Sequence, residues 1–354
     1  MRKTSLLFII TLCLVVETFA QGPAVIRRKA IGKPCHRGQY IEGQLLQLSA
    51  EDINLRVITR HPDSGVLVGG SVYLQNRQGL ILHSHGEQLN AVLVPKVTDI
   101  EDLTFTTREI GWRLYAGVLY VTNSGGACWR RVFKHKKLNS IYFTDIQHGW
   151  LAGRGGIIYH TNDGGRSWHR QNSGTDFNLG KIFFFDPLHG WAIGKKAYGD
   201  YPPKWKTALI ATRDGGQTWQ QLITDKVLSL EAFSFINNSE GWGIDSNSNI
   251  VHTLDGGRTW ILQRAADEKL WTSVFFVNER EGWVVGDGIL HTDDGGVSWM
   301  NQLQGGQHGL IEAVLFADRE HGWALRSQQL LHTQDGGLSW KSIFQDRRIA
   351  VSEK

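Results

Sequence analysis

Carboxylates and imidazoles are the side chains of this chain that could serve acid–base catalysis or metal binding, and most of them recur at fixed places. An aspartate is the third residue of an octapeptide T-x-D-G-G-x-S/T-W, which occurs at 161–168, 212–219, 253–260, 292–299 and 333–340. A glycosidase needs one pair of carboxylates at a set separation, whereas packing needs the same residue in every repeat. We therefore interpret all five as structural. They are Asp163, Asp214, Asp255, Asp294 and Asp335.

The histidines follow the same pattern. Of the 14 in the chain, eight stand either just before a Gly-Trp pair or in the strand-like run that precedes the octapeptide or its counterpart. These eight are His83, His148, His160, His189, His252, His291, His321 and His332. A closed metal site needs ligands that converge, and residues spread over separate repeats do not converge. The sequence therefore predicts no metal site and no cofactor.

The octapeptide, with a variant TNSGGACW at 122–129, sets the period of the chain. Its closing tryptophans are 39, 51, 41, 39 and 41 residues apart, a spacing found in repeat architectures. They are Trp129, Trp168, Trp219, Trp260, Trp299 and Trp340. Each unit holds four runs of strand length separated by Gly, Asn and Asp, for example 140–143, 150–153, 157–161 and 167–171. Such runs are typical of antiparallel strands in a meander.

Four strands and about 40 residues per unit are typical of a β-propeller blade. Six clear units follow an eroded one, which starts at Leu55 and lacks the octapeptide and both tryptophans. The sequence thus predicts an all-β, seven-bladed β-propeller of four-stranded antiparallel blades over residues 55–345, with a degenerate first blade. Twelve of the 14 tryptophans occupy two repeat positions, and we expect their rings in the core, since each buried aromatic removes ~150–250 Å² from water.

These residues resemble a known pattern. The octapeptide is similar to the Asp-box, or BNR, repeat of sialidases, sortilin-type receptors and several glycoside hydrolases, in which it joins the third and fourth strands on the face opposite the binding site. A D-x-x-x-G-W element precedes it at 145–150, 186–191 and 318–323. With this element, residues 55–345 resemble the photosystem II stability and assembly factor family and its non-photosynthetic bacterial relatives. The resemblance implies a seven-bladed propeller that acts as a binding scaffold and not as an enzyme.

The two ends of the chain lie outside the repeats. A basic start, an apolar run at 6–16 and a small-residue exit at Ala20 predict a signal peptide over 1–20. We therefore expect an exported protein, periplasmic or extracellular, with a leader over 21–54 and a tail over 346–354. The apolar run is shorter than the ~20 residues of a spanning helix, so we expect no integral membrane segment once the signal is removed.

Charge and cysteine content narrow the partners. The formal net charge is +4, and a dedicated nucleic-acid binder would carry a strong basic stripe, so we expect no nucleic acid. After signal removal Cys35 and Cys128 remain. In an oxidising compartment they either pair and tie the leader to the second blade, or stay as isolated thiols. We expect a monomer.

Features that break the period are the candidates for binding. The fourth unit is ten residues longer than the fifth, 51 against 41, through the insertion KKAYGDYPPKWKTA at 195–208. In a meander this connection lies on the face opposite the Asp-boxes. Interaction hot spots have the same aromatic and basic composition, although a solvated loop explains it equally well. We assign partner binding to this insertion and to other residues of the same face. They are Lys195, Lys196, Tyr198, Tyr201, Lys204, Trp205, Lys206, Arg154, Arg264, Trp271 and Arg326.

Two functions from different classes follow. We expect a non-catalytic scaffold that binds a protein or peptide, such as a subunit of an envelope or membrane complex, as an assembly or stability factor. The alternative is a carbohydrate-binding, sialidase-like or glycosidase-like Asp-box propeller. A sialidase also needs a tyrosine nucleophile and an arginine cluster, and the nearest early arginines, Arg27 and Arg28, lie in the leader.

Overall fold

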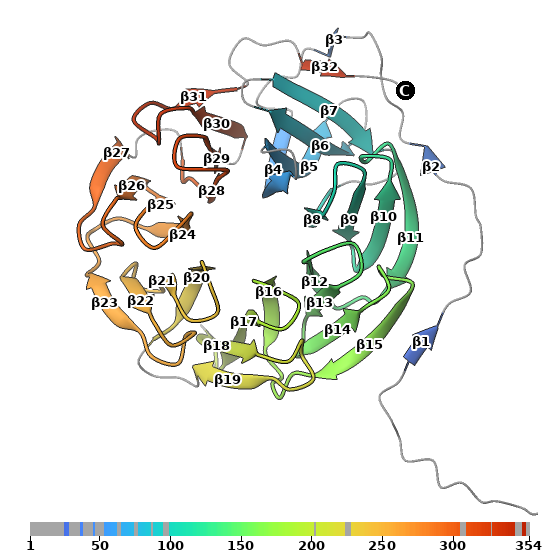
Figure 1. Cartoon of the computed structure of the whole chain (residues 1–354), viewed down its shortest axis with the longest axis horizontal. Helices are drawn as coiled ribbons and strands as arrows, with labels where there is room; N and C mark the ends of the chain where they lie inside the picture. Colours follow the sequence, from blue (N-terminus) through green and yellow to red (C-terminus); the bar gives the residue numbers. More distant parts are fainter. Residues whose placement is uncertain are drawn as a thin grey trace, which may run out of the picture.

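Seven sheets, each built on four antiparallel strands, form a ring around a central axis (Figure 1), which confirms the seven-bladed β-propeller. The computed structural model describes residues 53–61, 65–73, 77–85, 88–94, 99–201, 203–223, 228–304, 309–326, 328–343 and 349–351, together with the short segments 25–27, 36–37 and 45–46. The predicted signal peptide lies outside the described residues. No helix that could span a membrane occurs within the described ranges.

Each blade is a meander that runs from the ring centre to its rim. Blade 1 contains β4 (Ile53–His61), β5 (Gly65–Tyr73), β6 (Arg77–His85) and β7 (Gln88–Val94). Blade 2 contains β8 (Asp102–Phe105), β9 (Ile110–Tyr115), β10 (Val118–Asn123) and β11 (Cys128–Lys134). Blade 3 contains β12 (Leu138–Phe143), β13 (Gly149–Gly153), β14 (Ile157–Thr161) and β15 (Ser167–Asn172). Blade 4 contains β16 (Asn178–Phe184), β17 (Gly190–Tyr198), β18 (Lys204–Thr212) and β19 (Gln220–Ile223).

The last three blades repeat this order. Blade 5 contains β20 (Leu230–Phe235), β21 (Gly241–Asp245), β22 (Ile250–Thr253) and β23 (Ile261–Arg264). Blade 6 contains β24 (Trp271–Phe276), β25 (Gly282–Gly286), β26 (Gly288–Thr292) and β27 (Met300–Gln304). Blade 7 contains β28 (Ala313–Phe316), β29 (Gly322–Arg326), β30 (Gln329–Thr333) and β31 (Lys341–Ser342). We call the face with the Asp-box turns, between third and fourth strands, the Asp-box face. The turns between first and second strands share it.

A Gly-Trp pair opens the second strand in blades 2 to 7 and connects neighbouring blades. Gly149 lies opposite Phe143, and a Cβ there would come within 2.4 Å of the Phe143 ring, so only glycine fits. Phe143 then stacks on Trp112 of the preceding blade, with ring centroids 3.6 Å apart. The same stack recurs between later blades, for example between Trp150 and Phe184 at 3.6 Å. The tryptophan spacing in the sequence is thus the spacing of inter-blade contacts.

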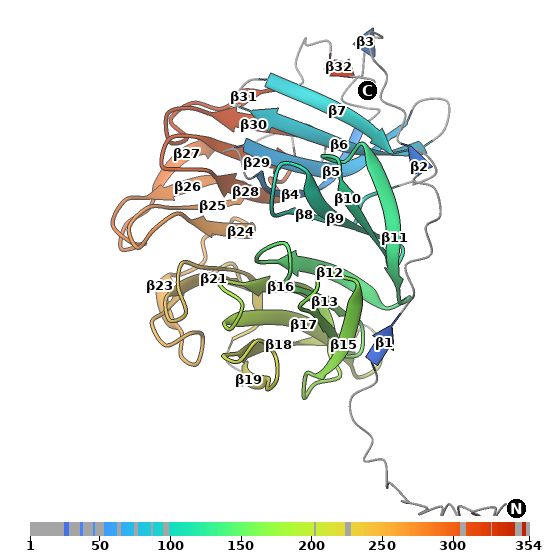
Figure 2. The same ribbon diagram turned by 45° about the vertical axis from the view of Figure 1, so that its right-hand side comes forward.

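Segments outside the repeats cover part of the rim. Short leader strands β1 (Val25–Arg27) and β2 (His36–Arg37) pair with the outer strands of blades 3 and 2, and Figure 2 shows both at the outer side of the ring. Strands β32 (Ile349–Val351) and β3 (Leu45–Leu46) extend blade 1.

We expected all twelve repeat tryptophans in the core, and the structure corrects this expectation for four of them. Trp129 and Trp168, at the paired positions, are buried. The Asp-box tryptophans of blades 4 to 7 are only half-buried, because the outer strands there form the sheet edges among the described residues. These four are Trp219, Trp260, Trp299 and Trp340.

Cys128 is disulfide-bonded. Strand β2, which follows directly after Cys35, pairs with β11, and Cys128 lies opposite Arg37. Cys35 itself lies outside the described residues, so its pairing with Cys128 stays a prediction.

Candidate functional site

The Asp-box carboxylates are fully engaged inside their own turns. Asp294 accepts hydrogen bonds from the Ser298 hydroxyl at 2.6 Å, the Ser298 backbone N–H at 2.9 Å and the Thr292 hydroxyl at 2.8 Å. The Ser298 hydroxyl, the Ser298 N–H and the Thr292 hydroxyl hold the pKa of Asp294 down to about 2. The other four Asp-box aspartates make the same bonds. A carboxylate held in this way stabilises its own turn. It is unsuited to act as a general acid, because a general acid needs a raised pKa.

The Asp-box also carries the bond to the preceding blade. The backbone carbonyl of Gly295 accepts the indole N–H of Trp242 at 3.0 Å and the side-chain amide of Gln263 at 3.0 Å. Two other boxes have the same pair of donors, and Gln171 and Gln302 supply the amides. In blade 7 the Trp323 indole bonds instead to the hydroxyl of Ser84, because blade 1 lacks an Asp-box.

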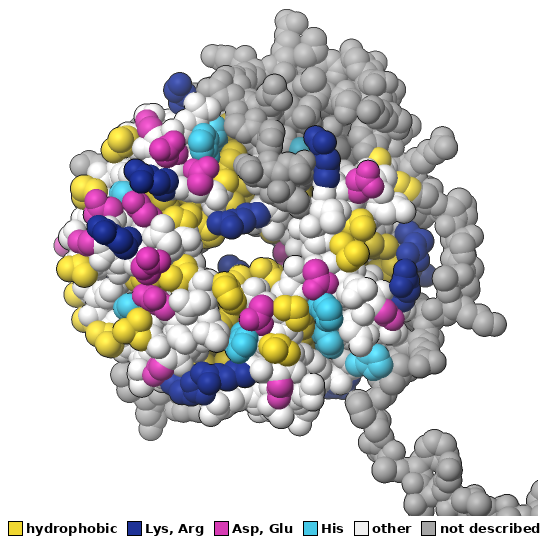
Figure 3. All heavy atoms as spheres, in the orientation of Figure 1, with side chains coloured by type: hydrophobic (Ala, Val, Ile, Leu, Met, Phe, Trp, Pro, Cys, Tyr) yellow, Lys and Arg dark blue, Asp and Glu magenta, His cyan; other side chains and the backbone are white. Residues whose placement is uncertain are grey.

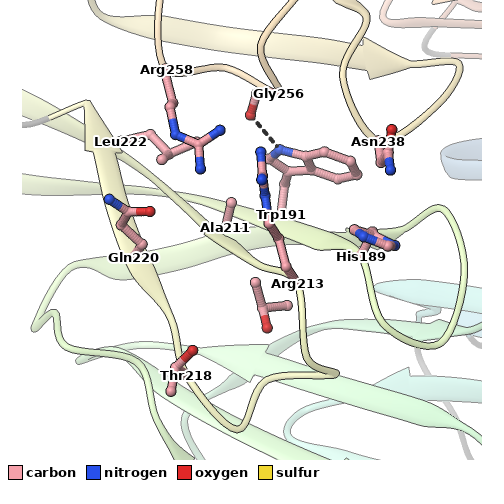
Figure 4. A pocket seen from close by; sticks show the side chains of 11 residues that line it. His189, Trp191, Ala211, Arg213, Thr218, Gln220, Leu222, Asn238, Gly256 and Arg258 are labelled. Carbon is pink, nitrogen blue, oxygen red and sulfur yellow. Dashed lines mark hydrogen bonds between the residues drawn. The ribbon is translucent and has the colours of Figure 1, made fainter.

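At the boundary of blades 4 and 5 this arrangement is incomplete. Trp191 donates its indole N–H to the Gly256 carbonyl at 2.9 Å, but Leu222 stands three residues after the box tryptophan, where blades 3, 5 and 6 have glutamine. A pocket of about 110 Å³ lies beside this contact. Figure 4 shows Trp191, Leu222 and two guanidinium groups around it. Because Asp-box residues line it, the pocket belongs to the Asp-box side of the ring.

The charge of this pocket comes from Arg213 and Arg258. Arg213 has no hydrogen-bond or ion-pair partner in the part of the chain that the structure describes, and Arg258 donates one bond to the Asp255 carbonyl at 3.0 Å. The imidazole of His189 also lines the pocket and pairs with Asp186 at 2.9 Å. Two arginines with free N–H groups form a fork that suits a carboxylate or another small anion.

The blade-4 insertion forms a regular hairpin instead of an irregular connection. Strands β17 and β18 extend to Tyr198 and Lys204, which lie opposite one another. Near its tip Tyr201 is 95% and Trp205 59% exposed, and the Lys206 ammonium lies 5.0 Å from the centre of the Tyr198 ring. The hairpin therefore exposes aromatic side chains on the face opposite the Asp-boxes.

Two lysines of this hairpin are less available than expected. Lys195 pairs with Glu231 of blade 5, and Lys196 pairs with Asp176. These ion pairs attach the base of the hairpin to its surroundings and reduce its net positive charge.

The remaining predicted contact residues divide into exposed and buried ones. Arg154 is exposed, and half-buried Arg264 pairs with Asp267 at 3.0 Å. The prediction is wrong for Trp271, which is 2% exposed, because its ring packs in the core between blades 5 and 6. It is also wrong for Arg326 as a surface residue, since this side chain is 8% exposed and burial lowers its pKa.

Groups that a hydrolase or a metal would use are sparse on the inner strands. Among the described residues of β4, β8, β12, β16, β20, β24 and β28, the carboxylates are Asp102 and Glu231. Asp102 accepts bonds from the Ser140 hydroxyl at 2.9 Å and the Ile141 N–H at 2.8 Å, and burial raises its pKa to about 6. Glu231 is held by Lys195. The described ranges contain no cluster of three His, Cys, Asp or Glu side chains fit for a metal ion.

Sequence reasoning missed the Arg213–Arg258 pocket because it treated the Asp-boxes as uniform. Arg213 and Arg258 are the second residue of one box and the sixth residue of the next, and both line the pocket. Within the five consecutive pairs of boxes from 122–129 to 333–340, only this pair has arginine at both positions. Aligning the boxes by these variable positions, and noting Leu222, would have singled out this boundary.

One protein family and several solved structures are similar to this chain. The family described as photosynthesis system II assembly factor YCF48 matches residues 82–176, 171–270 and 220–307. A structure of YCF48 bound to D1 peptide is 22% identical, with a TM-score of 0.56 over 69% of this chain and 80% of that one. YCF48 from Cyanidioschyzon merolae is 16% identical, with a TM-score of 0.55 over 72% and 86%.

The same ring occurs in an enzyme. The Niastella koreensis GH74 enzyme is 12% identical, with a TM-score of 0.51 over 82% of this chain and 65% of that one. No protein in the curated set matches the chain. At such identities the likeness to solved structures establishes the propeller fold alone.

Proposed function

Because the chain belongs to the photosynthesis system II assembly factor YCF48 family, we propose that it is an exported, non-catalytic scaffold that binds a peptide segment of a partner protein. The partner is a subunit of an envelope or membrane complex whose assembly or stability the scaffold supports. Export is supported by the sequence of residues 1–20 and by the disulfide at Cys128, since disulfides persist in oxidising compartments.

The observation that carries this proposal is the pocket with Arg213 and Arg258. Its volume of about 110 Å³ suits one acidic side chain or a chain terminus, given that a water molecule occupies ≈ 30 Å³ in the liquid. Two guanidinium groups without a carboxylate partner favour an acidic group of the peptide. The D1 peptide bound to YCF48 in the similar structure supports a partner of this class.

A second contact surface is the hairpin that carries Tyr201 and Trp205. These exposed rings offer apolar area at low entropic cost, as interaction hot spots do. The hairpin and the pocket lie on opposite faces of the ring, so separate variants test them independently.

The test is a synthetic peptide array with randomised positions. The wild-type protein should capture peptides enriched in Asp and Glu, and Arg213→Gln/Arg258→Gln should lose this enrichment. Arg166→Gln is the matched control, because Arg166 occupies in the blade-3 box the position that Arg258 has in blade 5. Tyr201→Ala/Trp205→Ala reports on the hairpin. Acidic enrichment that survives the double arginine change would refute the pocket, and an array without captured peptides would refute the function.

Carbohydrate binding is the second candidate, favoured by the exposed rings of the hairpin and by the GH74 enzyme among the similar folds. A glycan array and a panel of aryl glycosides separate the two. Saturable glycan binding that is lost in Tyr201→Ala/Trp205→Ala would replace the peptide proposal, and turnover of an aryl glycoside would make the protein an enzyme.

A further inference from the structure

The centre of the ring holds a cation without a carboxylate partner. Arg60, near the end of β4, donates an N–H to the Phe316 carbonyl of blade 7 at 2.8 Å. Its guanidinium lies 5.3 Å from the centre of the Phe275 ring of blade 6. No acid of the described residues forms an ion pair with it. The side chain is exposed, and partial desolvation by its neighbours in the ring lowers its pKa.

Besides Phe275, a second aromatic side chain lies near this charge. Tyr142 of blade 3 is close enough for electrostatic interaction with Arg60, and burial raises the pKa of its hydroxyl to about 12. The Tyr142 ring meets the Phe183 ring edge-on at 5.2 Å. Phe183, Phe275 and Tyr142 are all half-buried. In the space-filling view, basic and apolar side chains border the central opening (Figure 3).

A second cation lies on the inner strand of blade 4. The Lys181 ammonium of β16 is 6.0 Å from the centre of the Phe233 ring. It interacts electrostatically with Asp102, whose oxygens already accept bonds from Ser140 and Ile141. Asp102 therefore balances Lys181 and leaves the charge of Arg60 uncompensated.

We propose that the central opening is a binding site for a small organic carboxylate with a planar apolar body, held by the Arg60 guanidinium and the Tyr142 hydroxyl between Phe183 and Phe275. The Arg60 side chain is exposed, and a guanidinium has five N–H donors, of which the Phe316 carbonyl takes one. A bound carboxylate would accept hydrogen bonds from the remaining N–H donors, and the apolar ring of the same ligand would contact the Phe183 and Phe275 side chains. This site is independent of the peptide pocket between blades 4 and 5.

Arg60 also joins blade 1 to blade 7, so a purely structural role is the competing explanation. The two roles differ at Tyr142, since Tyr142→Phe keeps the ring and its contact with Phe183 while it removes the hydroxyl. Arg60→Gln removes the charge but retains an amide donor for the Phe316 carbonyl.

The experiment is calorimetric titration of the purified protein with phenylacetate, with neutral phenylacetamide and with inorganic phosphate. We expect saturable binding of phenylacetate, at least fivefold weaker in Tyr142→Phe and lost in Arg60→Gln. Arg213→Gln/Arg258→Gln should bind phenylacetate as the wild type does, which separates this site from the peptide pocket. No saturable binding up to about 20 mM, equal binding of phenylacetamide or phosphate, or unchanged affinity in Tyr142→Phe would overturn the proposal.

Discussion

Replacing Leu222 with glutamine should close the pocket between blades 4 and 5 without unfolding the blade. In blades 3, 5 and 6 a glutamine at this position donates to the glycine carbonyl of the next box at 2.8 to 3.0 Å. The corresponding carbonyl in blade 5 belongs to Gly256, which already accepts the Trp191 indole. The new amide should reach it, as in the other blades, and occupy the pocket.

The expected change in stability is small because two effects oppose each other. A net hydrogen bond contributes ~0.5–1.5 kcal/mol. Leu222 is half-buried, and loss of half the burial of a leucine costs about 1 kcal/mol. The free energy of unfolding should therefore change by no more than about 1 kcal/mol. With m near 3 kcal/mol/M, the urea midpoint should move by less than about 0.4 M.

The assay pairs urea unfolding with binding of the peptides that the wild type captures on the array. We expect Leu222→Gln to lose most of the affinity while its midpoint stays in this range, and Leu222→Met, which leaves the pocket apolar and open, to keep the affinity. Full affinity in Leu222→Gln would refute the argument that the missing glutamine opens the site. A loss of stability above about 2 kcal/mol would refute the assumed geometry.

Three further predictions concern the scaffold. In urea unfolding, Trp242→Phe should lower the free energy of unfolding by about 1 kcal/mol more than Trp112→Phe does. The reason is that the Trp242 indole bonds to the Gly295 carbonyl, while the Trp112 indole has no partner among the described residues. Equal losses of stability would contradict this. Burial lowers the pKa of His160 to about 4, below the unfolded value of ≈ 6.5, so stability should fall as pH drops from 6.5 to 4, and His160→Phe should flatten that slope. The pKa of Asp294 is about 2, so its contribution, present above the unfolded pKa of ≈ 3.9, should be lost on acidification towards pH 2. The melting temperatures of the wild type and of Asp294→Asn should therefore converge towards pH 2. A difference that stays constant with pH would contradict the stabilising role of the Asp294 carboxylate.

The repeated positions could be predicted from the sequence because the same packing contact or hydrogen bond recurs in successive blades. Glycine before tryptophan, and phenylalanine at the end of the inner strand, recur because the five blade boundaries from 2/3 to 6/7 use the same stack, as at Gly149, Phe143 and Trp112. The Asp-box recurs because each turn closes with the same hydrogen bonds. The hairpin at 195–208 was also identifiable, since it lengthens one period.

Positions that act across a boundary were harder to predict. Trp271 looks like a surface aromatic because it lies outside the repeat, yet it is buried between two blades. Arg213 and Arg258 are 45 residues apart (258 − 213) and look like ordinary surface charges. They meet only because consecutive blades pack side by side.

The sequence by itself determined the blade number, the strand order and the structural role of the Asp-boxes, because these depend on contacts within one period of about 40 residues. Only the tertiary structure decided which charges lack partners. Arg60 reaches Phe316, 256 residues away, and its isolation from carboxylates follows from closing the ring. Ring closure brings inner strands from all blades to one axis, and burial and pairing at that axis are properties of the assembled ring rather than of any repeat.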